Sequence, residues 1–266
     1  MAIQWSLVLF TALTGLAGWM FAAIAVSEFK GTMKDAAFPA GLVALIVLIV
    51  GGCCSVTHLS HPDRMLGALG HPTSGIFTEA VLVGLVAICA IVYLILLKRD
   101  ASAGARKACV ALAAVFGIAL SFLAGSSYMM SSRPSWNTFA LPLGYMGTVI
   151  PAGIAAYLAV AGAKKVEVDG IFPTLLMVGG IIAALTAAIY AAVSGTMADS
   201  VLYIWVMAVA IGGLLPAVLG YLAKKKPASM LTYASVALIC AVVGSVAFRC
   251  FMWVSTTSID NFFHTI

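Results

Sequence analysis

The side chains of this sequence that could do chemistry are ionisable groups in or beside very apolar stretches. Glu79 lies inside such a stretch, and no basic residue stands one helical turn away from it. A charge at the centre of a membrane span costs roughly 2.5 to 3.5 kcal/mol on insertion scales. We therefore expect Glu79 to be protonated, to face a polar cavity, or to pair across helices with His58, Arg64 or Arg249.

His58 ends the apolar stretch that precedes Glu79. If one helix ends near residue 60 and the next begins near residue 75, His58 and Glu79 lie at similar depth on adjacent antiparallel helices. A histidine exchanges protons near neutral pH, and a buried carboxyl can take a second proton. The pair suits a site that takes protons from an oxygen-bearing amphipathic ring such as a quinol. The alternative interpretation of His58 is an interfacial helix cap.

Further polar and aromatic residues are expected on the same side of the membrane. Arginine and tryptophan could line the entrance of the site and hold the ring, while Arg249 stands near the outer end of the last apolar stretch. The alternatives are snorkelling for Arg64 and Arg133, and membrane anchoring in the aromatic belt for Trp136. The candidate binding residues are His58, Arg64, Glu79, Tyr128, Arg133, Trp136 and Arg249.

The sequence offers no obvious metal or haem site. A haem held by two histidines needs both of them inside facing spans, and only His58 is near a span. The six cysteines form no CxxC pattern, so we interpret them as small core residues. Electrons leaving a quinol here would need an acceptor on another polypeptide, docked close to the site.

Composition excludes a soluble globular protein, because 63% of the residues are hydrophobic and only 9% are charged. The apolar runs are as long as a bilayer is thick. We predict an all-α integral membrane protein, with residues 1–266 forming a single anchor domain of eight transmembrane helices. The helices are predicted near residues 5–27, 36–59, 75–97, 106–129, 139–163, 170–193, 200–222 and 229–253.

The basic residues predict the orientation of this bundle. Eleven of the 14 lysines and arginines lie in or beside the loops after the first, third, fifth and seventh helices. The opposite side of the bundle has only Arg64, Arg133 and Arg249. The positive-inside rule places those loops in the cytoplasm and both termini outside. The net charge of +5 thus reflects the orientation of the protein in the membrane. Nucleic-acid binding is not indicated.

Several segments resemble the DmsC family, the membrane anchor subunit of dimethyl sulfoxide reductase and related molybdenum oxidoreductases. The resemblance rests on residues 5–11 (WSLVLFT), 58–64 (HLSHPDR) and 133–138 (RPSWNT), together with Glu79 and Tyr128. Residues 142–144 (PLG) extend it. Ser60 and Met65 depart from the family pattern, where glycine and alanine are usual.

The resemblance implies a multi-pass subunit of the cell inner membrane that oxidises menaquinol to menaquinone in anaerobic respiration. The resemblance also implies that His58 and Glu79 are residues of the quinol site. It also implies two partners, an iron–sulfur subunit and a molybdopterin catalytic subunit, which hold the iron–sulfur clusters and the molybdopterin. Since the candidate site faces outward and no haem spans the membrane, the electron-accepting subunit is expected to dock on the outer surface near the 60–74 and 130–138 loops.

Two other functions remain open at this stage. A transporter would use Glu79 and Arg249 as gating or substrate charges and would work without redox partners. A structural tether would hold the complex at the membrane without a quinone site. Substitution of His58 or Glu79 would then leave quinol oxidation unchanged.

Overall fold

The computed structural model describes residues 2–57, 67 and 70–255 of the chain. Within these residues the fold is all-helical, and eight segments are long and apolar enough to cross a membrane. The predicted class and number of spans are thus confirmed, while the side of the membrane on which the termini lie stays a prediction. The helices are α1 (Trp5–Lys30), α2 (Lys34–Val56), α3 (Gly75–Lys98), α4 (Ala103–Ser126), α5 (Ala140–Gly147), α6 (Ile150–Ala163), α7 (Ile171–Val193), η2 (Leu202–Leu214), α8 (Leu215–Lys225), η3 (Pro227–Ser229) and α9 (Met230–Val254).

Two of the predicted spans are not uniform α-helices. The fifth is divided into α5 and α6, and Pro151 stands in the first turn of α6. Proline has no N–H to donate to the carbonyl four residues earlier, and its ring clashes with that carbonyl. The seventh span begins as the π-helix η2 and continues as α8, which has Pro216 in its first turn. Both changes of winding therefore stand directly before a proline.

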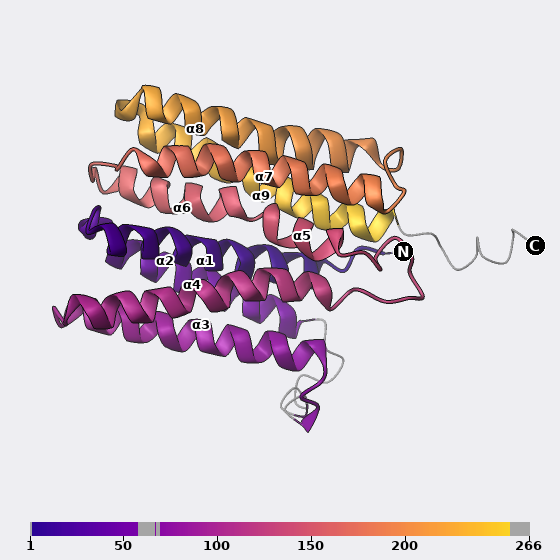
Figure 1. Ribbon diagram of the computed structural model, residues 1–266, viewed down its shortest axis with the longest axis horizontal. Helices are drawn as coiled ribbons and strands as arrows, with labels where there is room; N and C mark the ends of the chain where they lie inside the picture. Colours follow the sequence, from indigo (N-terminus) through magenta and orange to yellow (C-terminus); the bar gives the residue numbers. More distant parts are fainter. Residues whose placement is uncertain (1, 58–66, 68–69, 256–266) are drawn as a thin grey trace, which may run out of the picture.

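The helices run side by side along the long axis of the molecule (Figure 1). Helix α1 packs against α2, α4 and α6, and α9 packs against α6, η2 and α8. The contacts of α1 and α2 with α6 join the first four spans to the last four. Helix α1 begins and α9 ends at the same end of the bundle, as an even number of spans requires (Figure 1).

Small residues bring some of these helices into backbone contact. A Cβ atom built on Gly18 of α1 would lie 2.6 Å from the carbonyl carbon of Gly117 in α4. Gly212 of η2 meets Gly244 of α9 in a similarly close contact. Lipid tails are as apolar as the helix surfaces, so no hydrophobic effect drives the helices together. Helices in a membrane therefore associate through close packing of this kind.

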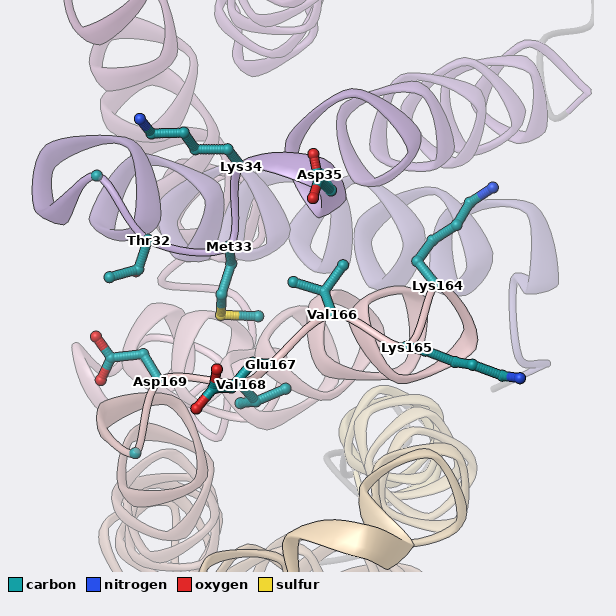
Figure 2. A pocket seen from close by; sticks show the side chains of 12 residues that line it. Thr32, Met33, Lys34, Asp35, Lys164, Lys165, Val166, Glu167, Val168 and Asp169 are labelled. Atoms are coloured by element: carbon teal, nitrogen blue, oxygen red, sulfur yellow. The ribbon is translucent and has the colours of Figure 1, made fainter.

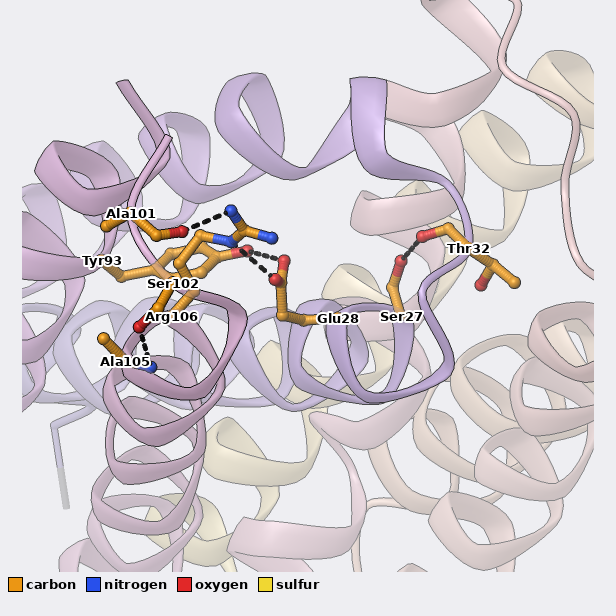
Figure 3. Close-up of polar contacts among 8 residues, drawn as sticks. All are labelled: Ser27, Glu28, Thr32, Tyr93, Ala101, Ser102, Ala105 and Arg106. Atoms are coloured by element: carbon orange, nitrogen blue, oxygen red, sulfur yellow. Dashed lines mark hydrogen bonds and ion pairs between the residues drawn. The ribbon is translucent and has the colours of Figure 1, made fainter. Parts of the chain in front are cut away.

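One end of the bundle, which we call the basic end, is formed by the α1–α2, α3–α4, α6–α7 and α8–α9 connections. A polar cluster ties three helices together there (Figure 3). The Arg106 Nε of α4 donates to the Glu28 Oε1 of α1 at 2.8 Å, and the Tyr93 hydroxyl of α3 donates to Glu28 Oε2 at 3.1 Å. The Glu28 carboxylate is therefore satisfied from two neighbouring helices.

Candidate functional site

Glu79 lies in the second turn of α3, at the end of the bundle opposite the basic end, which we call the Glu79 end. The Ser74 hydroxyl caps this helix by accepting from the backbone N–H of Phe77 at 3.1 Å. This cap fixes where α3 begins and hence the depth of Glu79. The Glu79 side chain is half-buried, and the Ser127 hydroxyl lies within hydrogen-bonding reach of its carboxyl.

Ser127 follows the last residue of α4 and packs against the start of α3. A Cβ atom on Gly75 would lie only 2.6 Å from the Ser127 Oγ. The Ser127 hydroxyl itself donates to the Leu123 carbonyl at 3.1 Å. Since a hydroxyl can accept hydrogen bonds while it donates one, Ser127 can also accept from a protonated Glu79. If Glu79 ionises, the hydroxyl can rotate and donate to the carboxylate instead.

Tyr128, the next residue, brings an aromatic phenol to the same place. Burial raises the pKa of the Tyr128 phenol, the negative charge of Glu79 raises it further, and the positive charge of Arg249 lowers it. The phenol therefore stays protonated at neutral pH and can donate a hydrogen bond. The end of α4 thus brings both Ser127 and Tyr128 to the side of Glu79.

The Tyr128 ring belongs to an aromatic cluster made by three segments: the α4–α5 connection, α5 and α9. Its centroid lies 5.6 Å from that of Tyr145 in α5, 6.0 Å from that of Trp136 and 6.0 Å from that of Trp253 in α9. Trp136 and Trp253 are 5.1 Å apart at an interplanar angle of 83°. Edge-to-face contacts of this kind hold each ring in one orientation.

Trp136 and Arg133 close the cluster on the side of the α4–α5 connection. The Trp136 side chain is buried, and its indole N–H donates to the Met252 carbonyl at 2.9 Å. The Arg133 guanidinium stacks over the Trp136 ring, 4.2 Å from its centroid. Trp136 therefore packs inside the protein, and its N–H already has an acceptor.

Arg249 lies beneath the cluster and is completely buried. Its Nε donates to the Thr11 hydroxyl at 2.7 Å, its Nη1 to the Ser245 carbonyl at 2.9 Å, and its Nη2 to the Tyr145 carbonyl at 3.2 Å. Further bonds go to the Ser245 and Thr148 hydroxyls and to the Thr11 carbonyl. Its guanidinium carbon also lies 4.6 Å from the Tyr145 ring centroid. All its described hydrogen bonds therefore go to neutral oxygens of three helices and the α5–α6 junction.

The structure thus brings five of the predicted site residues to one end of the bundle. Glu79, Tyr128 and Trp136 are joined through Ser127 and the aromatic cluster, with Arg133 stacked outside it and Arg249 packed beneath it. His58 and Arg64 lie outside the described residues. The predicted pairing of either residue with Glu79 therefore stays a prediction. The binding roles assigned to all these residues stay predictions.

Three residues near Glu79 were not predicted as site residues: Ser127, Tyr145 and Trp253. Ser127 adjoins Tyr128, and its adjacency to a predicted residue was an available signal. Tyr145 and Trp253 lie within apolar stretches whose pattern only indicates spans. Their meeting with Tyr128 depends on how α4, α5 and α9 pack, which no local spacing encodes.

Polar residues also surround a hollow of about 880 Å³ at the basic end (Figure 2). Its lining includes the charged side chains of Lys34, Asp35, Lys164, Lys165, Glu167 and Asp169. A hydrogen bond from the Lys30 ammonium lowers the pKa of the Asp169 carboxyl, and a backbone N–H from Ile171 lowers it further. Because lysines and carboxylates are balanced here, the hollow lacks a field of one sign that would select an ionic ligand. Nor do the predicted site residues line it.

The described part of the chain contains no group of three or more histidine, cysteine, aspartate or glutamate side chains placed to hold a metal ion. The Glu79 end instead offers a carboxyl, two hydroxyls and aromatic rings. These groups suit an organic ring that carries oxygen atoms.

Comparison with known proteins shows the family to which this chain belongs. The family model described as "DMSO reductase anchor subunit (DmsC)" matches residues 1–204 of the 266. A comparison with curated proteins found no match. The matched part runs from α1 into η2 and includes Glu79, Tyr128 and Trp136. The chain therefore belongs to the DmsC family, the membrane anchor subunits of DMSO reductase-like complexes.

Proposed function

We propose that this multi-pass membrane anchor oxidises menaquinol at its Glu79 end and passes the electrons to an iron–sulfur subunit docked there. The observation that carries the proposal is the Glu79 carboxyl, half-buried beside Ser127 and electrostatically coupled to Tyr128. It is a proton acceptor at the edge of an aromatic cluster, without a described basic partner. The proposed setting is the inner membrane of a cell in anaerobic respiration, with a molybdopterin subunit completing the complex.

The residues present fit such a ligand. Menaquinol supplies two electrons and two protons when it is oxidised to menaquinone. Within the aromatic cluster, Tyr128 is the partly exposed ring, and it offers a flat apolar surface of the kind on which a naphthoquinol ring packs. The Tyr128 hydroxyl can donate to one of its oxygens, and Glu79 can accept from a hydroxyl group. The second proton acceptor of the proposal is His58, as predicted from the sequence.

Glu79 and Ser127 together account for the fate of one proton. The ionised Glu79 accepts a proton from a menaquinol hydroxyl, and the Ser127 hydroxyl, which stabilised the carboxylate, turns back to the Leu123 carbonyl. Loss of the proton to water restores the carboxylate. Ser127 is exposed, which gives this proton a route out of the protein. The two electrons leave to clusters of the partner subunit, so that charge and mass balance over the cycle.

The first prediction tests the proton role of Glu79. In the intact complex, Glu79→Gln keeps the shape of the side chain but cannot accept a proton. We expect menaquinol-dependent reduction of the terminal acceptor to fall by about 100-fold, within the usual range for loss of a general base. Reduction by a water-soluble dye that feeds the catalytic subunit directly should stay unchanged.

Glu167→Gln is the matched control, because it makes the same chemical change at an exposed residue of the basic end. It should leave both activities intact. Normal menaquinol turnover by a fully assembled Glu79→Gln complex would refute the proposed role of Glu79.

A further inference from the structure

The indole N–H of Trp253 is a buried donor without an acceptor among the described residues. The side chain is only 5% exposed. The neighbouring indole of Trp136, by contrast, donates to the Met252 carbonyl. Leaving a buried N–H unpaired costs about 1–3 kcal/mol, and native proteins rarely do so without a reason.

The Trp253 ring is held rigidly beside the candidate site. It meets Trp136 at 83° and Tyr128 at 81°, with ring centroids 5.1 and 6.0 Å apart. The charges of Glu79 and Arg249 both act on the phenol of Tyr128. The unpaired donor therefore belongs to the ring next to the one coupled to Glu79.

We propose that the Trp253 indole N–H donates a hydrogen bond to an oxygen of the bound naphthoquinone ring. This inference rests on the proposed function and names a binding residue that neither the sequence pattern nor the family match assigns. An indole N–H donates but cannot accept a proton. Trp253 therefore holds one oxygen of the ring without competing with Glu79, which takes the proton. The bound ligand also supplies the acceptor that the described part of the protein does not provide for this group.

The oxidised and reduced ligands differ in what they can offer to Trp253. A quinone carbonyl only accepts hydrogen bonds, whereas a quinol hydroxyl accepts and donates. The Trp253 N–H is matched to both, so loss of this donor should weaken binding in either redox state. Its effect should appear mainly in KM, while loss of the proton acceptor Glu79 should appear mainly in kcat.

The test measures binding of 2,3-dimethyl-1,4-naphthoquinone to the purified complex by isothermal titration calorimetry. Trp253→Phe removes the N–H but also shrinks the ring. A second variant therefore carries 3-benzothienylalanine at position 253, which keeps the bicyclic shape and replaces N–H by sulfur. We expect Kd to rise about fivefold to thirtyfold in both variants, as the loss of one buried hydrogen bond predicts.

Trp19→Phe provides the matched control. The indole N–H of Trp19 in α1 is also buried without an acceptor among the described residues, but Trp19 packs against Gly153 in the middle of the bundle. Its substitution should leave Kd unchanged. An effect of Trp253→Phe that the benzothienyl variant does not reproduce would assign the loss to ring packing and overturn the inference.

The outcomes separate this inference from the proposed function. If both Trp253 variants bind the naphthoquinone as tightly as the parent while Glu79→Gln still abolishes turnover, Trp253 is not a ligand but the proposed function stands. If the parent complex itself does not bind the naphthoquinone and Glu79→Gln turns over normally, both proposals fail.

Discussion

At the scale of single residues, the largest difference from expectation concerns Arg249. The sequence left it as a binding residue, a partner of Glu79 or a transporter gate. In the structure every guanidinium nitrogen donates to an oxygen of α1, α9 or the α5–α6 segment. A planar guanidinium can join several chain segments in this way because its donors point in fixed directions. Arg249 thus fixes the segments on which Tyr145 and Trp253 stand.

The second prediction follows from this bonding. Arg249→Met keeps the apolar stem but removes hydrogen bonds from a charged donor, each of which is worth about 1.5–3 kcal/mol. We expect the free energy of unfolding in detergent to fall by roughly 3 kcal/mol or more, measured by circular dichroism during denaturation. Arg99→Met, at an exposed residue of the basic end, should change it by less than about 0.5 kcal/mol. An Arg249→Met protein as stable as its parent would contradict a structural role.

At the scale of helices, glycines and prolines decide how closely the spans approach. Gly18 and Gly117 let α1 and α4 touch along their backbones, and α4 ends at the site residues Ser127 and Tyr128. Pro151, in the first turn of α6, interrupts the fifth span, so that α5 and α6 pack as separate helices. The position of Tyr128 relative to Tyr145 follows from these two features together.

The third prediction tests the α1–α4 contact. Gly18→Ala places a Cβ atom 2.6 Å from the Gly117 backbone, which cannot rotate away as a side chain could. The helices must separate, and we expect a loss of about 1–3 kcal/mol in the free energy of unfolding. The melting temperature in detergent measures this loss.

Gly84→Ala is the control for this variant. Gly84 lies in α3, and a Cβ built on it would meet no described atom within 4 Å apart from the nearby backbone of its own helix. Alanine there should be neutral or slightly stabilising, because it favours the helix over glycine by up to about 1 kcal/mol. Equal melting temperatures for the Gly18→Ala and parent proteins would show that the α1–α4 contact is looser than described.

At the scale of the whole molecule, the two ends of the bundle differ in chemistry. The basic end carries lysine-rich connections and the Glu28–Arg106 ion pair. The Glu79 end carries the carboxyl, the hydroxyls and the aromatic cluster. The positive-inside rule predicts that the Glu79 end faces away from the cytoplasm, and this end is where the redox partners are expected to dock.

The fourth prediction concerns this orientation. Ser131→Cys and Lys226→Cys each add a thiol at an exposed residue, one at each end of the bundle. A membrane-impermeant maleimide should label the Ser131→Cys variant only from outside intact spheroplasts, and the Lys226→Cys variant only in inverted vesicles. The parent chain, labelled in parallel, gives the background of its native cysteines. The opposite pattern would reverse the predicted orientation.

The class of fold, the number of spans and the end of the bundle at which the candidate site residues gather could be predicted from the sequence. Apolar length, charge and loop position are local properties, from which the helices and a predicted orientation follow directly. The sequence also identified Glu79, because an acidic residue inside an apolar run raises the free energy of membrane insertion, however that run packs. The tertiary structure alone decided that Arg249 is engaged by neutral oxygens and that Tyr145 and Trp253 join Tyr128. Those meetings depend on the close approach of helices far apart in the chain, which local patterns do not specify.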